Sequence, residues 1–172
     1  MKKYNLFSFD KLLNIDEDFL ANIIRSVGFY RIKAKRIKNF VKFVKEMYNG
    51  DLDAMKLKDL KSLRKELISI KGIGEETADA ILLYAFDKCT FVVDKYTRRM
   101  FSRIGIIKGT ESYDEIKNIF ENSLPKDVKV YKEYHALIDE FSKNICKKVP
   151  LCENCFLRGL CKYYNRARGL VV

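Results

Sequence analysis

Helical spacing of apolar residues runs through almost the whole sequence. In the segment 30–48, Ile37, Val41 and Val44 fall on one face of a helix, and lysines occupy most of the rest. The 172-residue chain has only two prolines, so few positions forbid a helix. The pattern predicts helices at about 8–13, 16–27, 30–48, 58–70, 75–86, 95–104, 112–123 and 128–145. The predicted fold class is all α, with 90–93 as a short strand-like run.

Basic residues outnumber acidic ones along the whole chain. Lysine and arginine total 34 against 23 aspartates and glutamates, which gives a net charge of +11. Such an excess indicates a polyanionic partner, nucleic acid first. No apolar run approaches the length of a membrane span, and the first residues do not form a secretion signal. We therefore expect an intracellular protein without a membrane partner. The chain has no glutamine and no tryptophan and is rich in lysine, glutamate and isoleucine, a bias that resembles proteins from hot habitats, where thermolabile amides are avoided.

Four of the five cysteines lie close together near the end of the chain. Their pattern is Cys146-x5-Cys152-x2-Cys155-x5-Cys161, which can wrap one metal ion or an iron–sulfur cluster. Zinc suits four thiolates equally well, but zinc ribbons normally carry two short Cys-x2-Cys pairs and this chain has one. The spacing therefore favours iron and sulfur. The fifth cysteine, Cys89, is predicted to be a small buried apolar residue.

A glycine turn separates two of the predicted helices. Lys71-Gly72-Ile73-Gly74 breaks the pattern, and the next helix begins at Glu75. Two glycines permit a sharp turn and a close approach of the backbone, while the first amides of a helix attract an anion such as a DNA phosphate. The predicted phosphate contacts are Lys71, Gly72, Ile73, Gly74, Glu75 and Thr77. An ordinary corner between two helices has the same local pattern.

The order of these features carries a family resemblance. The hairpin at 71–78 is followed by Asp94 within Val-Val-Asp-Lys-Tyr-Thr-Arg-Arg at 92–99, and then by the four cysteines. From about residue 16 to 162, the chain resembles the helix-hairpin-helix (HhH-GPD) DNA glycosylases of the endonuclease III superfamily. The resemblance implies a base excision repair enzyme, in which Asp94 stabilises positive charge on the sugar and orients or deprotonates a water. Asp94 also suits a helix N-cap.

Further assignments follow from the same resemblance. It implies a [4Fe-4S] cluster held by Cys146, Cys152, Cys155 and Cys161, although the family usually has six residues between its first two ligands. Lys147 and Lys148, inside that first loop, are candidates for phosphate contact. The implied partner is double-stranded DNA containing a damaged or mismatched base. We expect a cytoplasmic, nucleoid-associated monomer.

One position distinguishes the reaction types within this family. Bifunctional members carry a lysine two residues after the second hairpin glycine, and its amine forms a Schiff base with the sugar. Here that residue is Glu76, which predicts a monofunctional N-glycosylase, a hydrolase without AP lyase activity. A bifunctional glycosylase using another lysine and a non-catalytic DNA-binding module are the alternatives. Alkylated purines, mismatched uracil or thymine, and oxidised bases remain candidate substrates.

The predicted architecture has two lobes. A helical barrel lobe at 1–90 would include the helix-hairpin-helix (58–86), and a lobe at 91–172 would carry Asp94 and the cluster segment 146–161. The groove between them would be the active site. The family's first helix, with its glutamine wedge, has no counterpart, so the fold is predicted to be shortened at the N-terminus. Phe29 and Tyr30 are predicted core residues rather than base-stacking residues, and His135 is predicted to be structural.

Overall fold

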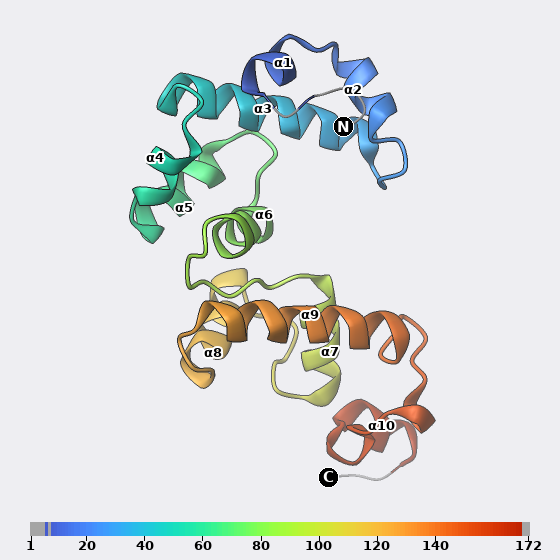
Figure 1. The fold of residues 1–172 in the computed structure, drawn as a ribbon. Coiled ribbons are helices and arrows are strands. Elements are labelled where there is room, and N and C mark those ends of the chain that lie inside the picture. The colour runs from blue at the N-terminus through green and yellow to red at the C-terminus, as the bar shows by residue number, and fades with distance from the viewer. Residues whose placement is uncertain (1–5, 7, 170–172) are drawn as a thin grey trace. The chain divides into compact units, whose positions relative to one another are not determined.

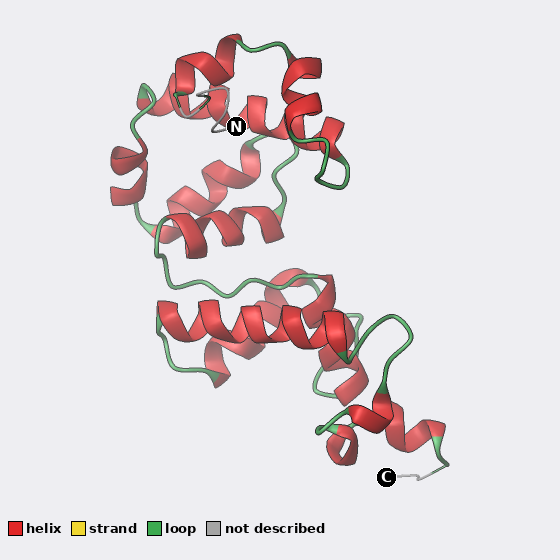
Figure 2. Cartoon of the chain, turned by 45° about the vertical axis from the view of Figure 1, so that its right-hand side comes forward, coloured by secondary structure: helices red, strands yellow, loops and turns green. Residues whose placement is uncertain are grey.

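The structure is a computed structural model that describes residue 6 and residues 8–169. Its described part contains helices, turns and loops but no strand, which confirms the all-α prediction (Figure 2). No helix in this part is long and apolar enough to cross a membrane. The chain forms two compact units, residues 1–78 and 79–172. This boundary falls inside the predicted hairpin segment rather than at residue 90.

The described residues of the first unit form five helices before the glycine turn. They are α1 (Phe9–Asn14), α2 (Glu17–Ile23), α3 (Tyr30–Tyr48), α4 (Leu52–Leu57) and α5 (Leu60–Ser69) (Figure 1). Both predicted N-caps are present, because the side chains of Ser8 and Asp16 accept hydrogen bonds from the amides of Lys11 and Phe19. α2 ends at Ile23, earlier than predicted, because the chain turns at residues 24–28. The unpredicted α4 is capped by Asp51.

A small apolar cluster joins α2 to α3. Leu20, Ala21 and Ala34 are almost fully buried, and the partly buried Tyr30 packs against them. The core prediction is therefore confirmed for Tyr30. It is wrong for Phe29, which is 81% exposed and has a left-handed backbone with φ of 57°.

The second unit is built on a core of aromatic rings. Its elements are α6 (Glu75–Ala80), which begins in the first unit and continues as the π-helix η2 (Ile81–Ala85), α7 (Lys95–Ile104), α8 (Tyr113–Ser123), α9 (Val128–Asn144), the 3-10 turns η3 (Cys152–Asn154) and η4 (Arg158–Leu160), and α10 (Lys162–Ala167). The run 90–93 is extended and buried but pairs with no strand. Phe91 stacks on Phe120 with ring centroids 4.4 Å apart and meets Tyr131 edge-on at 5.6 Å.

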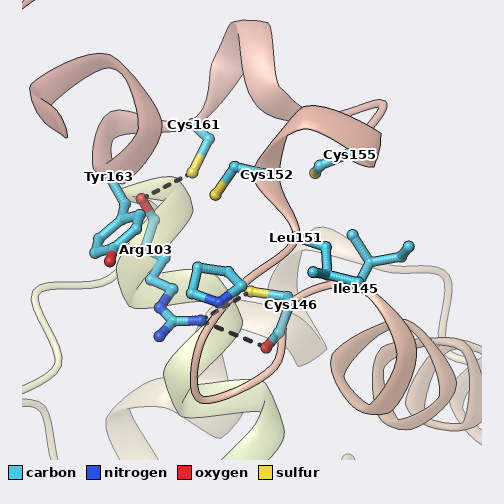
Figure 3. A pocket seen from close by; sticks show the side chains of 9 residues that line it. Arg103, Ile145, Cys146, Leu151, Cys152, Cys155, Cys161 and Tyr163 are labelled. Atoms are coloured by element: carbon cyan, nitrogen blue, oxygen red, sulfur yellow. Dashed lines mark hydrogen bonds between the residues drawn. The ribbon is translucent and has the colours of Figure 1, made fainter. Parts of the chain in front are cut away.

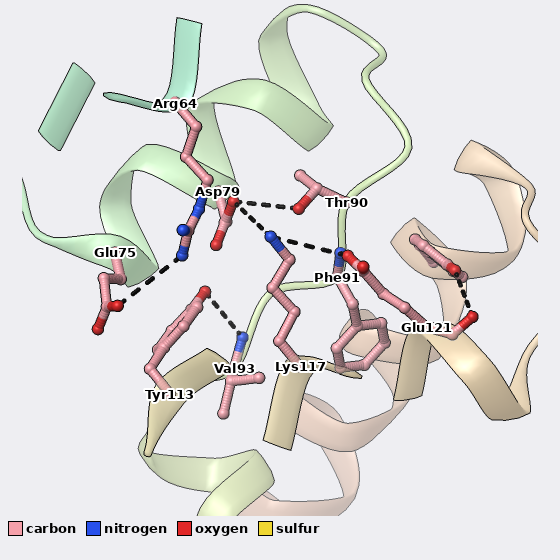
Figure 4. Close-up of polar contacts among 10 residues, drawn as sticks. Arg64, Glu75, Asp79, Thr90, Phe91, Val93, Tyr113, Lys117 and Glu121 are labelled. Atoms are coloured by element: carbon pink, nitrogen blue, oxygen red, sulfur yellow. Dashed lines mark hydrogen bonds and ion pairs between the residues drawn. The ribbon is translucent and has the colours of Figure 1, made fainter. Parts of the chain in front are cut away.

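A buried ion pair anchors this extended run (Figure 4). Asp79 is fully buried, and its Oδ1 accepts hydrogen bonds from Thr90 Oγ1 at 3.0 Å and Lys117 Nζ at 3.3 Å. Glu121 Oε1 lies 3.8 Å from the same ammonium and accepts a hydrogen bond from the amide of Phe91 at 2.8 Å. Because a buried charge needs partners, these contacts fix the segment that leads to α7.

Candidate functional site: an aspartate, a glycine hairpin and four cysteines

Asp94 lies at the start of α7, where the sequence predicts it. Its Oδ1 accepts hydrogen bonds from the Thr97 amide at 2.7 Å and from Thr97 Oγ1 at 2.9 Å. Thr97 is fully buried, whereas Asp94 is only half-buried. Within the described residues, no hydrogen bond reaches Oδ2. The N-cap therefore fixes one carboxylate oxygen and leaves the other available for a ligand or water.

The glycine hairpin is held from one side by α3. Gly72 has φ of +95°, and a Cβ there would lie 2.8 Å from Cγ of Arg36. The side-chain amide of Asn39 donates to the carbonyl of Lys71 at 2.7 Å. Both the conformation and the close approach require glycine at position 72.

The other predicted DNA contacts of the hairpin differ in which of their groups are accessible. Lys71, Gly74 and Thr77 are exposed, but the Ile73 side chain is buried, so only its backbone is accessible. The carboxylate of Glu75 lies 3.9 Å from the guanidinium of Arg64 (Figure 4). The first amides of α6 have no partner inside the helix, as at any helix start. The hairpin therefore offers backbone N–H groups rather than a set of basic side chains.

Arg103 holds the loop that contains Lys147 and Lys148. Its guanidinium donates to the carbonyls of Lys147 at 2.6 Å and Lys148 at 2.9 Å. The two lysine side chains are exposed. Arg99, one turn earlier on α7, donates to the carbonyl of Cys146 at 3.0 Å. Neither arginine is among the residues predicted from the sequence, although their i, i+4 spacing on a basic helix is a usable signal.

The four predicted cysteine ligands line one pocket (Figure 3). Arg103, Ile145, Pro150, Leu151 and Tyr163 complete its wall. Arg103 donates to Sγ of Cys146 at 3.5 Å, and Sγ of Cys161 donates to the carbonyl of Arg103 at 3.4 Å. Burial raises the pKa of the Cys152 thiol, and the other three thiols raise it further.

The four cysteines of this pocket determine which kind of metal group it can bind. Within the described residues, no three Cys, His, Asp or Glu side chains are grouped closely enough for a single metal ion. In a [4Fe-4S] cluster, each iron takes a different thiolate, so the four sulfurs surround a larger object than one zinc ion. Four cysteines around one apolar pocket fit such a group, with Arg103 as a donor to one sulfur.

The fifth cysteine lies outside this pocket. Cys89 is partly buried against the aromatic core of the second unit, and burial raises the pKa of its thiol. Its position agrees with the prediction of a small apolar core residue.

Comparisons with known proteins agree with this set of features. Residues 1–126 match the HhH-GPD superfamily of base excision DNA repair proteins. A candidate DNA repair glycosylase of Methanocaldococcus jannaschii is 54% identical over 162 residues, which cover 94% of this chain and 74% of that protein.

Two solved structures are similar as well. A trapped covalent complex of endonuclease III with DNA superposes with a TM-score of 0.77 at 26% identity, covering 94% of this chain and 71% of that one. The 3-methyladenine DNA glycosylase of H. pylori bound to 1,N6-ethenoadenine gives a TM-score of 0.65 at 31% identity, covering 78% and 66%. The chain belongs to the HhH-GPD superfamily of base excision DNA repair proteins and is a DNA glycosylase of the endonuclease III family.

Proposed function

We propose that this chain is a monofunctional DNA glycosylase that hydrolyses the N-glycosidic bond of N-alkylated purines in double-stranded DNA. The observation that carries the proposal is the Asp94 carboxylate, fixed through Oδ1 by Thr97 and open at Oδ2. A second observation, Glu76 at the lyase lysine position, supports the monofunctional part.

Asp94 supplies what loss of a base from a sugar requires. As the bond between C1′ and the base nitrogen breaks, positive charge develops on the sugar, and a fixed carboxylate stabilises it. The open Oδ2 also accepts the proton of the water that attacks C1′. A carboxylate held by two donors on its other oxygen needs little reorganisation for this task.

Glu76 does not support the lyase reaction. Strand cleavage by the bifunctional members proceeds through an imine, which requires an amine at this position. A carboxylate forms no imine, so water is the nucleophile in our proposal. A bifunctional enzyme using another lysine is the second candidate, and a DNA-binding module without catalysis is the third.

The proposed substrate class comes from the similarity to one solved structure. The H. pylori 3-methyladenine DNA glycosylase is 31% identical over 78% of this chain. Two endonuclease III relatives reach the same 31 to 32% identity, but Glu76 in place of the lyase lysine departs from the bifunctional members of that family. The thermostable thymine-DNA glycosylase shares 23%, which shows the fold alone. We therefore favour alkylated purines over mismatched pyrimidines and oxidised bases.

DNA binding in this proposal uses both charge and backbone. The net charge of +11 attracts the phosphates and makes binding sensitive to salt. The amides of the hairpin at 71–77 bind phosphate oxygens of one strand, and Lys147 and Lys148 bind phosphates from the exposed loop that Arg103 holds. The damaged base then leaves the stack for excision.

In this proposal, the four cysteines are the ligands of a [4Fe-4S] cluster. When bound, the cluster supplies rigidity to the C-terminal segment rather than an open coordination site for substrate. Arg99 and Arg103 tie the first ligand residue and the loop after it to α7. These contacts place the exposed side chains of Lys147 and Lys148 on a fixed backbone.

The test is a cleavage panel on duplexes that contain 3-methyladenine, 7-methylguanine, uracil, a G·T mismatch or 8-oxoguanine. Breaks that appear only after hot alkali indicate base removal without lyase activity. Asp94→Asn keeps an N-cap of equal quality, so it should lose excision while folding normally. Asp16→Asn is the matched control, because Asp16 caps α2 with the same geometry and is exposed.

Three outcomes would contradict parts of the proposal. Breaks before alkali, with a DNA adduct trapped by borohydride, would show a bifunctional enzyme. Excision of uracil or 8-oxoguanine in place of alkylated purines would correct the substrate. DNA binding without excision of any base would favour the third candidate, a DNA-binding module without catalysis.

A further inference from the structure

Tyr84 occupies an unusual backbone segment of the second unit. It lies in η2, the π-helical stretch Ile81–Ala85 that continues α6, and its side chain is 45% exposed. Single π-helical turns are rare and occur frequently at functional sites, because the extra residue redirects a side chain. Its neighbours Leu82 and Leu83 are fully buried. The π turn therefore presents the one polar aromatic side chain of this stretch to the surroundings.

The Tyr84 hydroxyl is paired with His135 of α9. It lies 2.8 Å from Nδ1 of His135, and the two rings are 5.9 Å apart. The other imidazole nitrogen, Nε2, is buried and has no hydrogen-bond partner among the described residues. An orphan acceptor is tolerated better than an orphan N–H group in a buried place. This favours the tautomer in which Nδ1–H donates to the Tyr84 oxygen and Nε2 carries no hydrogen.

That tautomer leaves the hydroxyl hydrogen of Tyr84 for another acceptor. Within the described chain, the remaining acceptor near it is the carbonyl of Lys132, at 3.4 Å. This distance is long for a hydrogen bond from a hydroxyl group, whose usual range ends near 3.0 Å. A ligand with an acceptor atom would therefore take the hydrogen bond without breaking a strong one.

α9 connects Tyr84 to the start of α7, where Asp94 lies. One face of α9 carries residues one turn apart, His135, Asp139 and Lys143. His135 at one end contacts Tyr84. At the other end, Nζ of Lys143 lies 5.8 Å from the ring centroid of Tyr96 on α7. Burial raises the pKa of Tyr84, and the charges of Asp139 and Asp94 raise it further. The phenol therefore stays protonated at neutral pH.

We propose that the Tyr84 hydroxyl, oriented by His135, donates a hydrogen bond to a ring nitrogen of the flipped purine and so enables excision of uncharged lesions. This inference rests on the proposed function. Tyr84 then contacts the substrate, and His135 is a positioning residue.

The chemistry explains why the charge of the lesion matters. When the C1′–N bond breaks, its electron pair stays on the base. A cationic lesion such as 7-methylguanine leaves as a neutral molecule and needs no donor. Hypoxanthine is uncharged, so negative charge builds on its ring until a proton arrives from solvent, and a hydrogen bond from Tyr84 stabilises that charge. Water forms the new C1′–O bond and gives its proton to Asp94, which returns it to solvent.

The experiment compares single-turnover excision of hypoxanthine and 7-methylguanine by the full chain. Tyr84→Phe should slow excision of hypoxanthine by about 10- to 100-fold, the range of one hydrogen bond to a charged group, and should slow excision of 7-methylguanine much less. His135→Asn keeps a polar group near the Nδ1 position and should restore most of the hypoxanthine activity that His135→Leu loses. Tyr164→Phe is the control, because its hydroxyl also contacts a neighbour, Glu153, at 3.4 Å.

The ratio of the two rates separates the outcomes. Equal losses on both lesions would indicate a structural role and overturn the inference, as would no loss on either. Wild-type excision of 7-methylguanine alone would also overturn it, while the proposed function would stand. If the wild-type chain removes 3-methyladenine but neither of these two purines, the inference is overturned and the proposed function stands. If it removes none of the three, the proposed function itself fails. Circular dichroism melting of each variant checks that folding is preserved.

Discussion

Thr97 contacts Asp94 through two donors, its backbone amide at 2.7 Å and its hydroxyl at 2.9 Å, both on the same carboxylate oxygen. The amide bond is the usual N-cap contact, whereas the hydroxyl bond is additional. Because Thr97 is fully buried, it cannot turn away to water. These two hydrogen bonds hold the Asp94 carboxylate in one orientation. The N-cap role of Asp94 and its proposed catalytic role therefore support each other.

Thr97→Val tests whether this orientation matters. Valine keeps the branched shape but removes the hydroxyl donor, while the amide bond to Oδ1 remains. We expect a loss of about 1 kcal/mol in the free energy of unfolding and a fall of about tenfold in the single-turnover excision rate, with DNA affinity unchanged. Thr97→Ser restores the hydroxyl and should restore the rate. An unchanged rate in Thr97→Val would show that the amide alone orients Asp94.

Arg103→Lys tests how the proposed cluster loop is held. Lysine keeps the charge but has a single nitrogen, whereas Arg103 uses two separate guanidinium nitrogens to donate to the carbonyls of Lys147 and Lys148. We expect faster loss of iron and of visible absorbance in the presence of a chelator, and weaker binding to duplex DNA. Arg158→Lys is the control, because Arg158 donates to the carbonyl of Glu153. Equal iron loss in both variants would contradict this role for Arg103.

The sequence was sufficient for most helix starts in this chain. Ser8, Asp16 and Asp94 are N-caps as predicted, because a short polar side chain before an amphipathic segment satisfies the first helical amides. Ser112 likewise caps α8, together with Glu115, in a capping box. The cap signal is local, so the sequence contains all of it. It predicts where α7 begins and therefore where the Asp94 carboxylate is fixed.

Features that depend on distant contacts were not predictable in the same way. The Asp79–Lys117 pair and the Tyr84–His135 pair join residues far apart in the chain, and nothing in their local patterns indicates the partner. The π-helical turn that redirects Tyr84 has no recognised sequence signal here. The core prediction is wrong for Phe29 because its neighbour Tyr30 has the same aromatic character, and only the backbone conformation separates the two.

Ionisation of Tyr131 should lower the stability of the fold at alkaline pH. Burial, together with the nearby Cys89 and Glu121, raises the pKa of Tyr131 to about 12 from the ordinary value of 10.0. A raised pKa in the folded state means that stability is complete below about pH 10 and is lost as pH rises towards about 12. The loss from this group amounts to about 2 to 3 kcal/mol.

Urea unfolding of the wild-type chain and of Tyr131→Phe, each at about pH 8 and about pH 11.5, measures this effect. Phenylalanine has no hydroxyl to ionise, so the variant should lose less stability between the two pH values than the wild type does. The other tyrosines and the lysines titrate in both proteins and cancel in the comparison. Parallel losses in the two proteins would show that Tyr131 ionises as easily when folded as when unfolded.

Phe29 combines exposure with an unfavourable backbone, and this combination predicts opposite effects on stability and on DNA binding. Its φ of 57° is a conformation that costs a non-glycine residue about 1 to 2 kcal/mol, yet its ring is 81% exposed and adds little to the core. Phe29→Gly should therefore raise the free energy of unfolding by about 1 kcal/mol.

If the ring stacks on a DNA base, the same variant should bind lesion-containing duplex about tenfold more weakly. Asn49→Gly relieves a similar left-handed residue, with φ of 50°, at the end of α3 and should raise stability without changing DNA affinity. Equal affinity in both variants would show that the exposed ring makes no contact with DNA.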